Sequence, residues 1–289
     1  MRLVFNNARG IIMKPSISGL ILIVVLFRAA PLFAQFDSHV VSGASAAMGD
    51  VTVIADEPLA ATMGIASLVS HEKTSVAASF THGFVSDGLD VAALAIIHPL
   101  PFGTAAVAVD RFGDKMYNEM CASMTYAIPL GDNVGFGAAF HYLHSGTSDP
   151  LYEPLSRMTF SLALRYLPVE DVSISFRAYN PIAVLSSTPN DVRVPAIFSL
   201  GATYQFLDEL LGVAEIEKNL IYPVNFKFGL EYRFLVSYAF RLGLETAPLV
   251  YSFGFGIKGS QWGVDIAAQM HNYLGMTSVL SLYYSFGND

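Results

Sequence analysis

From residue 74 to residue 286 the chain alternates apolar and polar positions with a period of two. In NFKFGLEYRFLVSYAFRLGLE (225–245), large apolar residues at every second position are separated by small or charged ones. A period of two is typical of β-strands that have one face in an apolar environment and the other in a polar one. The pattern therefore predicts an all-β fold across most of the chain.

Fourteen strands follow from this pattern, with a margin of about two for the weakest stretches. We place them at residues 74–83, 89–98, 102–111, 118–128, 133–144, 156–167, 171–179, 194–206, 209–218, 225–234, 236–246, 250–258, 262–271 and 277–286. Most have the length of about 9–11 residues that a transmembrane strand needs.

The connections between these strands alternate in length. Those after even-numbered strands are short, whereas several after odd-numbered strands are longer, as in residues 144–156 and 180–193. Outer-membrane barrels have short periplasmic turns and longer outer loops. The lengths therefore predict a barrel with both chain ends on the periplasmic side.

The hairpin at 225–245 fixes its own register. In the predicted register three pairs lie opposite each other, namely Phe234 and Tyr238, Glu231 and Arg241, and Lys227 and Glu245. A slip of two residues would bring Arg233 opposite Arg241 and so place like charges side by side. The predicted register puts aromatic groups on one face and paired charges on the other.

Composition indicates which environment covers the aromatic face. The chain is 53% hydrophobic and 14% charged, with a mean hydropathy of +0.47, whereas soluble domains carry roughly 25% charged residues. Only one long apolar run exists, ISGLILIVVLF (17–27), so repeated helical spans are excluded. Because hydrocarbon tolerates only helices and closed sheets, we predict a transmembrane antiparallel β-barrel (74–289).

Residues 1–34 have the features of a cleaved secretory signal peptide. A basic start precedes the apolar run, and AAPLFA offers a cut after Ala34. A retained transmembrane anchor is the alternative interpretation. We expect export through this signal and residence in the bacterial outer membrane, with its lipid as the immediate partner.

The net charge and the cysteine content argue against nucleic-acid-binding and disulfide-rich proteins. The net charge is −8, and the four basic residues within 1–34 make the remainder more acidic still, which argues against a nucleic-acid partner. Cys121 is the only cysteine, so no disulfide framework can form within one chain.

Residues 35–73 do not alternate, and we predict that they form a plug segment inside the barrel. They are rich in small residues. Pro58 suits the first turn of a helix, and Asp56 and Glu57 suit its positive end, so a short helix is expected near 57–68. A narrow open conduit is the alternative to a plugged lumen.

By strand parity, one set of charged residues faces the lumen. These residues are Arg165, Arg177, Lys227, Glu231, Arg233, Arg241, Glu245, Lys258 and Asp265. Small residues on the same face leave room for the plug segment.

The stretch GASAAMGDVTVIADEPLAATMGIASL (43–68) resembles the N-terminal segment of FadL-like barrels, especially the PorV/PorQ branch. The matching plug-motif residues are Met48, Gly49, Asp56, Glu57 and Pro58. The Asn-Pro that usually follows is replaced here by Met63-Gly64. Further similarity lies in FGAAFHYL (136–143), GLEYRF (229–234), FRLGLE (240–245) and HNYLGMTSVLSLYYSFG (271–287). The resemblance implies a fourteen-stranded outer-membrane barrel with an N-terminal plug.

The resemblance also implies two functions. The first is an accessory role in protein secretion or surface assembly of the type IX kind, with secretion-system or exported proteins as partners. The alternative is FadL-like passive transport of small hydrophobic molecules. The chain is short for a fatty-acid transporter and lacks long outer insertions, which favours the first.

A third hypothesis, a surface hydrolase, needs a catalytic group of residues. Ser145 beside His144 is the only crude candidate, and adjacency in sequence is not evidence of a catalytic dyad. His141 and His144 point to opposite faces of a strand, so they do not form a metal site. We expect no enzyme activity, no catalytic or metal-binding residues and no cofactor.

Overall fold

The computed structural model describes residues 42–52, 57–59, 63–149, 151, 153–184 and 194–287. The chain divides into two compact units, Met1–Ala34 and Gln35–Asp289. All described residues belong to the second unit. The predicted signal peptide (1–34) lies outside the described residues and stays a prediction.

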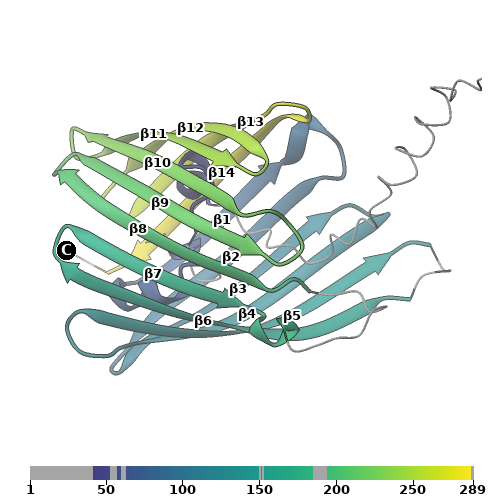
Figure 1. The fold of residues 1–289 in the computed structure, drawn as a ribbon, viewed down its shortest axis with the longest axis horizontal. Helices are drawn as coiled ribbons and strands as arrows, with labels where there is room; N and C mark the ends of the chain where they lie inside the picture. Colours follow the sequence, from purple (N-terminus) through teal and green to yellow (C-terminus); the bar gives the residue numbers. More distant parts are fainter. Residues whose placement is uncertain are drawn as a thin grey trace, which may run out of the picture. The chain divides into compact units, whose positions relative to one another are not determined.

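Antiparallel strands form a closed barrel, and all fourteen predicted strands are confirmed (Figure 1). They are β1 (Thr74–His82), β2 (Asp90–Leu100), β3 (Gly103–Gly113), β4 (Tyr117–Pro129), β5 (Val134–Thr147), β6 (Leu155–Val169), β7 (Val172–Tyr179), β8 (Ile197–Leu207), β9 (Leu210–Asn219), β10 (Asn225–Phe234), β11 (Tyr238–Thr246), β12 (Leu249–Lys258), β13 (Trp262–His271) and β14 (Gly275–Phe286). Each strand pairs with its sequence neighbours, and β1 pairs with β14. Closure leaves no open edge, so the backbone can satisfy its hydrogen bonds without water.

The turn lengths also follow the prediction. The connections after even-numbered strands cover only 101–102, 130–133, 170–171, 208–209, 235–237 and 259–261. The longest connections, 83–89, 148–154 and 180–196, lie at the opposite end. We refer to the two ends as the short-turn end and the outer end, since short turns face the periplasm in barrels of this kind.

The register predicted for the β10–β11 hairpin is confirmed pair by pair, including Glu231 with Arg241 and Lys227 with Glu245. On the outside, Phe228 and Phe240 are 46% and 45% exposed. The charged partners on the inner face are buried or half-buried. The aromatic residues therefore form part of the lipid-facing band.

Several strand ends differ from prediction by a few residues. The eighth strand begins at Ile197 rather than 194, and the last begins at Gly275 rather than 277. Val194 and Ala196 are buried without belonging to the strand. Alternation marks which face a side chain occupies, whereas a strand end is set by where ladder hydrogen bonds stop.

The N-terminal segment packs against the inner wall of the barrel (purple in Figure 1). The helix α2 (Gly43–Ala47) lies against β11–β14, and the 3₁₀ helix η2 (Ile65–Ser70) lies against β3–β6. Among the described residues, no helix has both the length and the apolar character needed to cross a bilayer.

The prediction of a helix near 57–68 needs correction. The described residues of that stretch contain no α-helix, and η2 begins only after Gly64. Glycine disfavours helix interiors, so the chain starts a tighter 3₁₀ turn beyond it. Sequence reasoning missed α2, since five residues cannot form a stable helix without packing. Asp56 lies outside the described residues.

The orientation can be tested by cysteine labelling in a Cys121→Ala background. Ser148 and Ser260 are both exposed, in an outer loop and a short turn respectively. We expect a membrane-impermeant maleimide to label Ser148→Cys on intact cells and to label Ser260→Cys only after the outer membrane is permeabilised. Labelling of Ser260→Cys alone on intact cells would show that the barrel is inserted the other way.

Candidate functional site

The described plug segment begins with a short capped helix. The Ser42 hydroxyl accepts a hydrogen bond from the Ser45 amide at 3.0 Å, which is the usual N-cap arrangement. The Gly43 amide donates to the Ser281 hydroxyl on β14 at 2.9 Å. A Cβ at Gly43 would lie 2.7 Å from the Asp265 carbonyl oxygen. Only glycine therefore permits this close approach of α2 to the wall.

The predicted Met48 and Gly49 pair contacts the wall where two glycines face each other. Gly49 has a φ of +77°, and a Cβ there would lie 2.7 Å from carbonyl oxygens of β10 and β11. Gly229 and Gly243 are cross-strand partners. A Cβ on Gly243 would overlap the Gly49 backbone, and one on Gly229 would lie 2.6 Å from Met48. These glycines make the recess in which the plug backbone lies.

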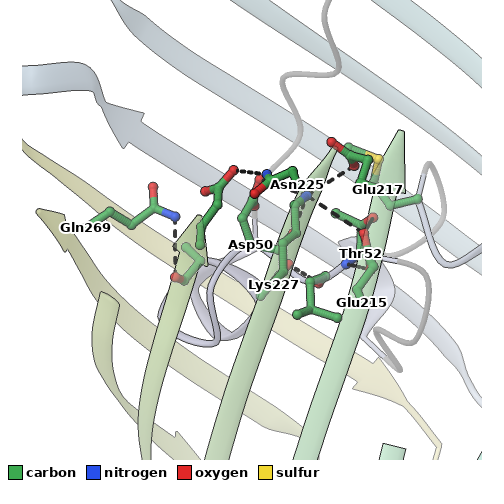
Figure 2. A network of polar contacts seen from close by, with 12 residues as sticks. Asp50, Thr52, Glu215, Glu217, Asn225, Lys227 and Gln269 are labelled. Atoms are coloured by element: carbon green, nitrogen blue, oxygen red, sulfur yellow. Dashed lines mark hydrogen bonds and ion pairs between the residues drawn. The ribbon is translucent and has the colours of Figure 1, made fainter. Parts of the chain in front are cut away.

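One buried lysine joins the plug segment to the wall (Figure 2). The Lys227 ammonium lies 3.1 Å from a Glu217 carboxylate oxygen, 3.7 Å from Glu215 and 3.9 Å from Asp50 of the plug. It also donates a hydrogen bond to the Asp50 carbonyl oxygen at 3.0 Å. We call these four residues the lysine cluster. Its ion pairs join the plug to β9 and β10.

Further hydrogen bonds extend the lysine cluster along the plug and into β11. The Thr52 amide donates to Glu215 at 2.8 Å, and the Asn225 amide group donates to Glu245 at 2.5 Å. Burial, reinforced by the carboxylates of Glu245, Glu217 and Glu215, raises the pKa of Asp50 to about 7, although Lys227 acts in the opposite direction. Asp50 therefore titrates near neutral pH.

A second group, the arginine cluster, lies on β10, β11 and β13. Arg241 donates to Glu231 and to Asp265, each at 2.5 Å, and Arg233 donates to Glu231 at 2.6 Å. Charge-assisted bonds of this kind are among the stronger side-chain interactions. Glu57 of the plug faces this cluster, and its burial together with the charge of Asp265 raises the pKa of Glu57 to about 7.

The remaining predicted lumen charges lie apart from these clusters. Arg165 donates to Ser173 at 2.9 Å and to Ser70, the last residue of η2, at 2.8 Å. Arg177 is buried and donates to the Met63 sulfur of the plug at 2.8 Å. Lys258 is exposed at the end of β12. The nine predicted residues thus serve several separate contacts.

Sequence reasoning missed three of the four members of the lysine cluster, since it placed only Lys227. Glu215 and Glu217 alternate with apolar residues in VAEIEKN (213–219), so the same parity rule could have placed them inside. Asp50 carries no periodic signal, since it lies in the irregular plug segment. Its role follows only from the close approach of plug and wall.

A cavity of about 900 Å³ lies on the short-turn side of the plug segment. Plug residues Met48 and Glu57 line one side, and wall residues Arg233, Lys258 and Tyr283 line another. It extends to the turns 235–237 and 259–261. The lumen is therefore hollow between the plug and the short-turn end.

The outer half of the lumen has a different character. Buried apolar side chains gather there, at the outer ends of β5, β7 and β8, and half-buried residues of β4 and β6 pack on them. We call this group the apolar cluster, and it consists of Leu143, Tyr179, Val194 and Ile197 with Cys121 and Leu155. These side chains remove apolar surface from water by packing against one another.

The hydrolase candidate finds no support in this geometry. Ser145 is buried on the inner face of β5, whereas the His144 ring lies on the other face and bonds Ser156 at 3.0 Å. The inner His141 has both ring nitrogens bonded to serines at 2.8 Å. Within the described ranges, no group of three or more His, Cys, Asp or Glu residues is placed to hold a metal ion.

Comparison with known proteins gives a structural likeness without a sequence match. No protein-family model and no curated protein sequence matches the chain. Its structure is similar to the toluene transporter TbuX of Ralstonia pickettii, with a TM-score of 0.68 at 13% identity over 88% of this chain and 100% of that one.

Two further crystal structures show a similar fold. A FadL homologue of Pseudomonas aeruginosa gives a TM-score of 0.65 at 10% identity, covering 85% of this chain and 98% of its own. The toluene transporter TodX of P. putida gives 0.62 at 10% identity, covering 88% and 100%. The FadL-like part of the resemblance is thus supported, while the PorV/PorQ part stays a prediction. The chain has the fold of FadL-type outer-membrane barrels.

Proposed function

We propose that this protein allows small hydrophobic molecules to cross the outer membrane passively. The observation that carries the proposal is the apolar cluster in the outer half of the lumen. In the outer half of the lumen, the inward-facing side chains of the wall outside this cluster are largely polar. An apolar group inside a polar lumen suits an apolar solute, because binding there removes apolar surface from water.

The arrangement along the barrel gives the solute a route with one barrier. The apolar cluster lies on the outer side of the plug segment, and the 900 Å³ cavity lies on the short-turn side. The plug segment, joined to the wall through the lysine cluster, lies between them. Passage therefore requires the plug to shift against the wall.

The wall is least complete beside the apolar cluster. β7 is the shortest strand and ends at Tyr179, which pairs with Ser161 of β6. The preceding part of β6, residues 155–159, pairs with β5 alone. Leu155, in this stretch that is paired on one side only, contributes to the apolar cluster. A solute dissolved in the membrane would meet the fewest ladder hydrogen bonds here.

The structural neighbours favour transport over the secretion role. TbuX and TodX are described as toluene transporters, and their likeness to this chain extends only to the fold at such low identity. The secretion role rests on sequence motifs within 43–68 and needs a protein partner. We therefore place transport first, reversing the order that the sequence motifs suggested.

Plug docking should depend on pH through Asp50 and Glu57. Their pKa values rise from 3.8 and 4.5 to about 7 when the plug is docked. A carboxyl with a raised pKa in the docked state binds its proton more tightly there. The stabilisation of the docked plug by each of these carboxyl groups is complete below about pH 4. It falls as pH rises from about 4 to 7 and is lost above that.

Uptake measurements test the proposed transport. In cells with a lipopolysaccharide outer membrane, expression of the chain should increase uptake of radiolabelled toluene. Leu143→Asn should lower this uptake about tenfold, because an unpaired amide in the apolar cluster costs roughly 1–3 kcal/mol.

Val91→Asn is the matched control, since it makes a similar change on the inner face of β2, outside both the apolar cluster and the cavity. Its uptake should stay near the wild-type value. Equal uptake of toluene by cells with and without the chain would contradict the transport proposal. Copurification of an exported protein in that case would favour the secretion role.

Hydrogen exchange of residues 42–52 tests the pH dependence of plug docking. After correction for intrinsic exchange rates, the opening free energy should fall between pH 5 and pH 8 as Asp50 and Glu57 ionise. Asp50→Asn and Glu57→Gln each replace a carboxyl group with an amide that cannot ionise. Each variant should therefore show a smaller change of opening free energy with pH. Asp114→Asn, in an outer turn, is the control that should leave it unchanged. An opening free energy that rises with pH would contradict the assignment.

A further inference from the structure

Arg177 is the most deeply buried charged side chain outside the two ion-pair clusters. It lies on the inner face of β7 with a relative exposure of 2%. It donates a hydrogen bond to the Met63 sulfur, and thioether sulfur is a weak acceptor. The buried Nε atom has no hydrogen-bond partner among the described residues. A buried guanidinium normally has a carboxylate or phosphate partner.

Among the described residues, no carboxylate forms an ion pair with Arg177. Glu217 is the nearest inner-face acid along the same row of the sheet, separated from Arg177 by Ser199 of β8. Its carboxylate is held by Lys227 at 3.1 Å. The lysine and arginine clusters thus pair their buried charges, whereas Arg177 has no carboxylate partner among the described residues.

Two hydroxyl groups beside Arg177 also lack partners. Ser199 lies directly opposite Arg177 across the β7–β8 ladder, and Ser175 lies two residues before Arg177 on the same face. Each serine is 1% exposed, and each Oγ atom is buried without a hydrogen bond. One cationic donor and two hydroxyl donors thus share one small region of the inner wall.

From these groups we infer that Arg177, Ser175 and Ser199 form a binding site for the carboxylate of a small organic anion. A carboxylate has two oxygens with about four acceptor positions, which match a guanidinium and two hydroxyls. The site stands on its own geometry and does not rest on the proposed transport. It adds an anionic class of ligand to a lumen otherwise suited to neutral apolar ones.

The surroundings of Arg177 indicate what the rest of the anion should be. Tyr179 and Ile197 of the apolar cluster are the next inward residues towards the outer end, and they face each other across β7 and β8. A ligand with its carboxylate at Arg177 would place its body against them. A compact aromatic or branched acid fits this pairing of charge and apolar surface.

The Met63 sulfur accepts the hydrogen bond from Arg177 that the anion would accept in its place. Its side chain is flexible and belongs to the plug segment. Replacement of a weak sulfur contact by a carboxylate would strengthen the bond to Arg177 and release Met63. Anion binding would therefore loosen one contact between plug and wall.

Calorimetric titration of the full barrel in non-ionic detergent tests the site with benzoate and benzamide, which share a ring and differ in charge. Wild type should bind benzoate at least roughly tenfold more tightly than benzamide, as expected for charge-assisted hydrogen bonds. Arg177→Gln should abolish this difference. Arg165→Gln, which removes another inner-face arginine, should preserve it.

Three further variants keep the test decisive if Arg177→Gln fails to fold. Ser175→Ala combined with Ser199→Ala should weaken benzoate binding several-fold, and Met63→Ala should strengthen it. Arg177→Met should also melt no lower than wild type without benzoate, since it removes an uncompensated charge. Equal binding of benzoate and benzamide by wild type, or unchanged benzoate affinity in the serine double variant, would overturn the inference.

Discussion

The need to pair every backbone amide and carbonyl in hydrocarbon determines the rest of this structure. A sheet meets that need only by closing, and fourteen strands close here through the β1–β14 pairing. Closure creates an inner surface that must be filled, hydrated or charged. The plug segment fills part of it, and the ion-pair clusters neutralise charges that the closed wall would otherwise bury alone. Fold and lumen chemistry thus have one cause.

The strands, their order and the β10–β11 register could be predicted because lipid on one side imposes strict alternation. Phe228 must face out and Lys227 must face in, since any shift by one residue exchanges the two faces. The same rule places nine charges inside. It cannot say which of them meet, because contacts between distant strands depend on barrel closure and on side-chain reach. Arg241 joins Asp265 from two strands away.

The plug segment was harder to predict, because its conformation is imposed by the wall. Helix α2 has only five residues, and its stability comes from packing and from its contact with Ser281. The partners of Gly49 are Gly229 and Gly243, almost two hundred residues away in sequence. A single sequence carries the glycines but gives no sign of their meeting. The apolar cluster was missed for the same reason, since its members come from five strands and the residues before β8.

Lys227 and Arg241, the central cations of the two ion-pair clusters, differ from Arg177 in what they bind. Lys227 and Arg241 each meet at least two carboxylates of the wall, and Lys227 also binds Asp50 of the plug segment. Among the described residues Arg177 meets no carboxylate, and it lies where the polar inner wall changes to the apolar cluster. Burial of an uncompensated guanidinium opposes folding, and the paired clusters show that this wall can supply carboxylates. A charge that the fold leaves unpaired beside an apolar surface is best explained by a ligand that carries both an anionic group and an apolar body.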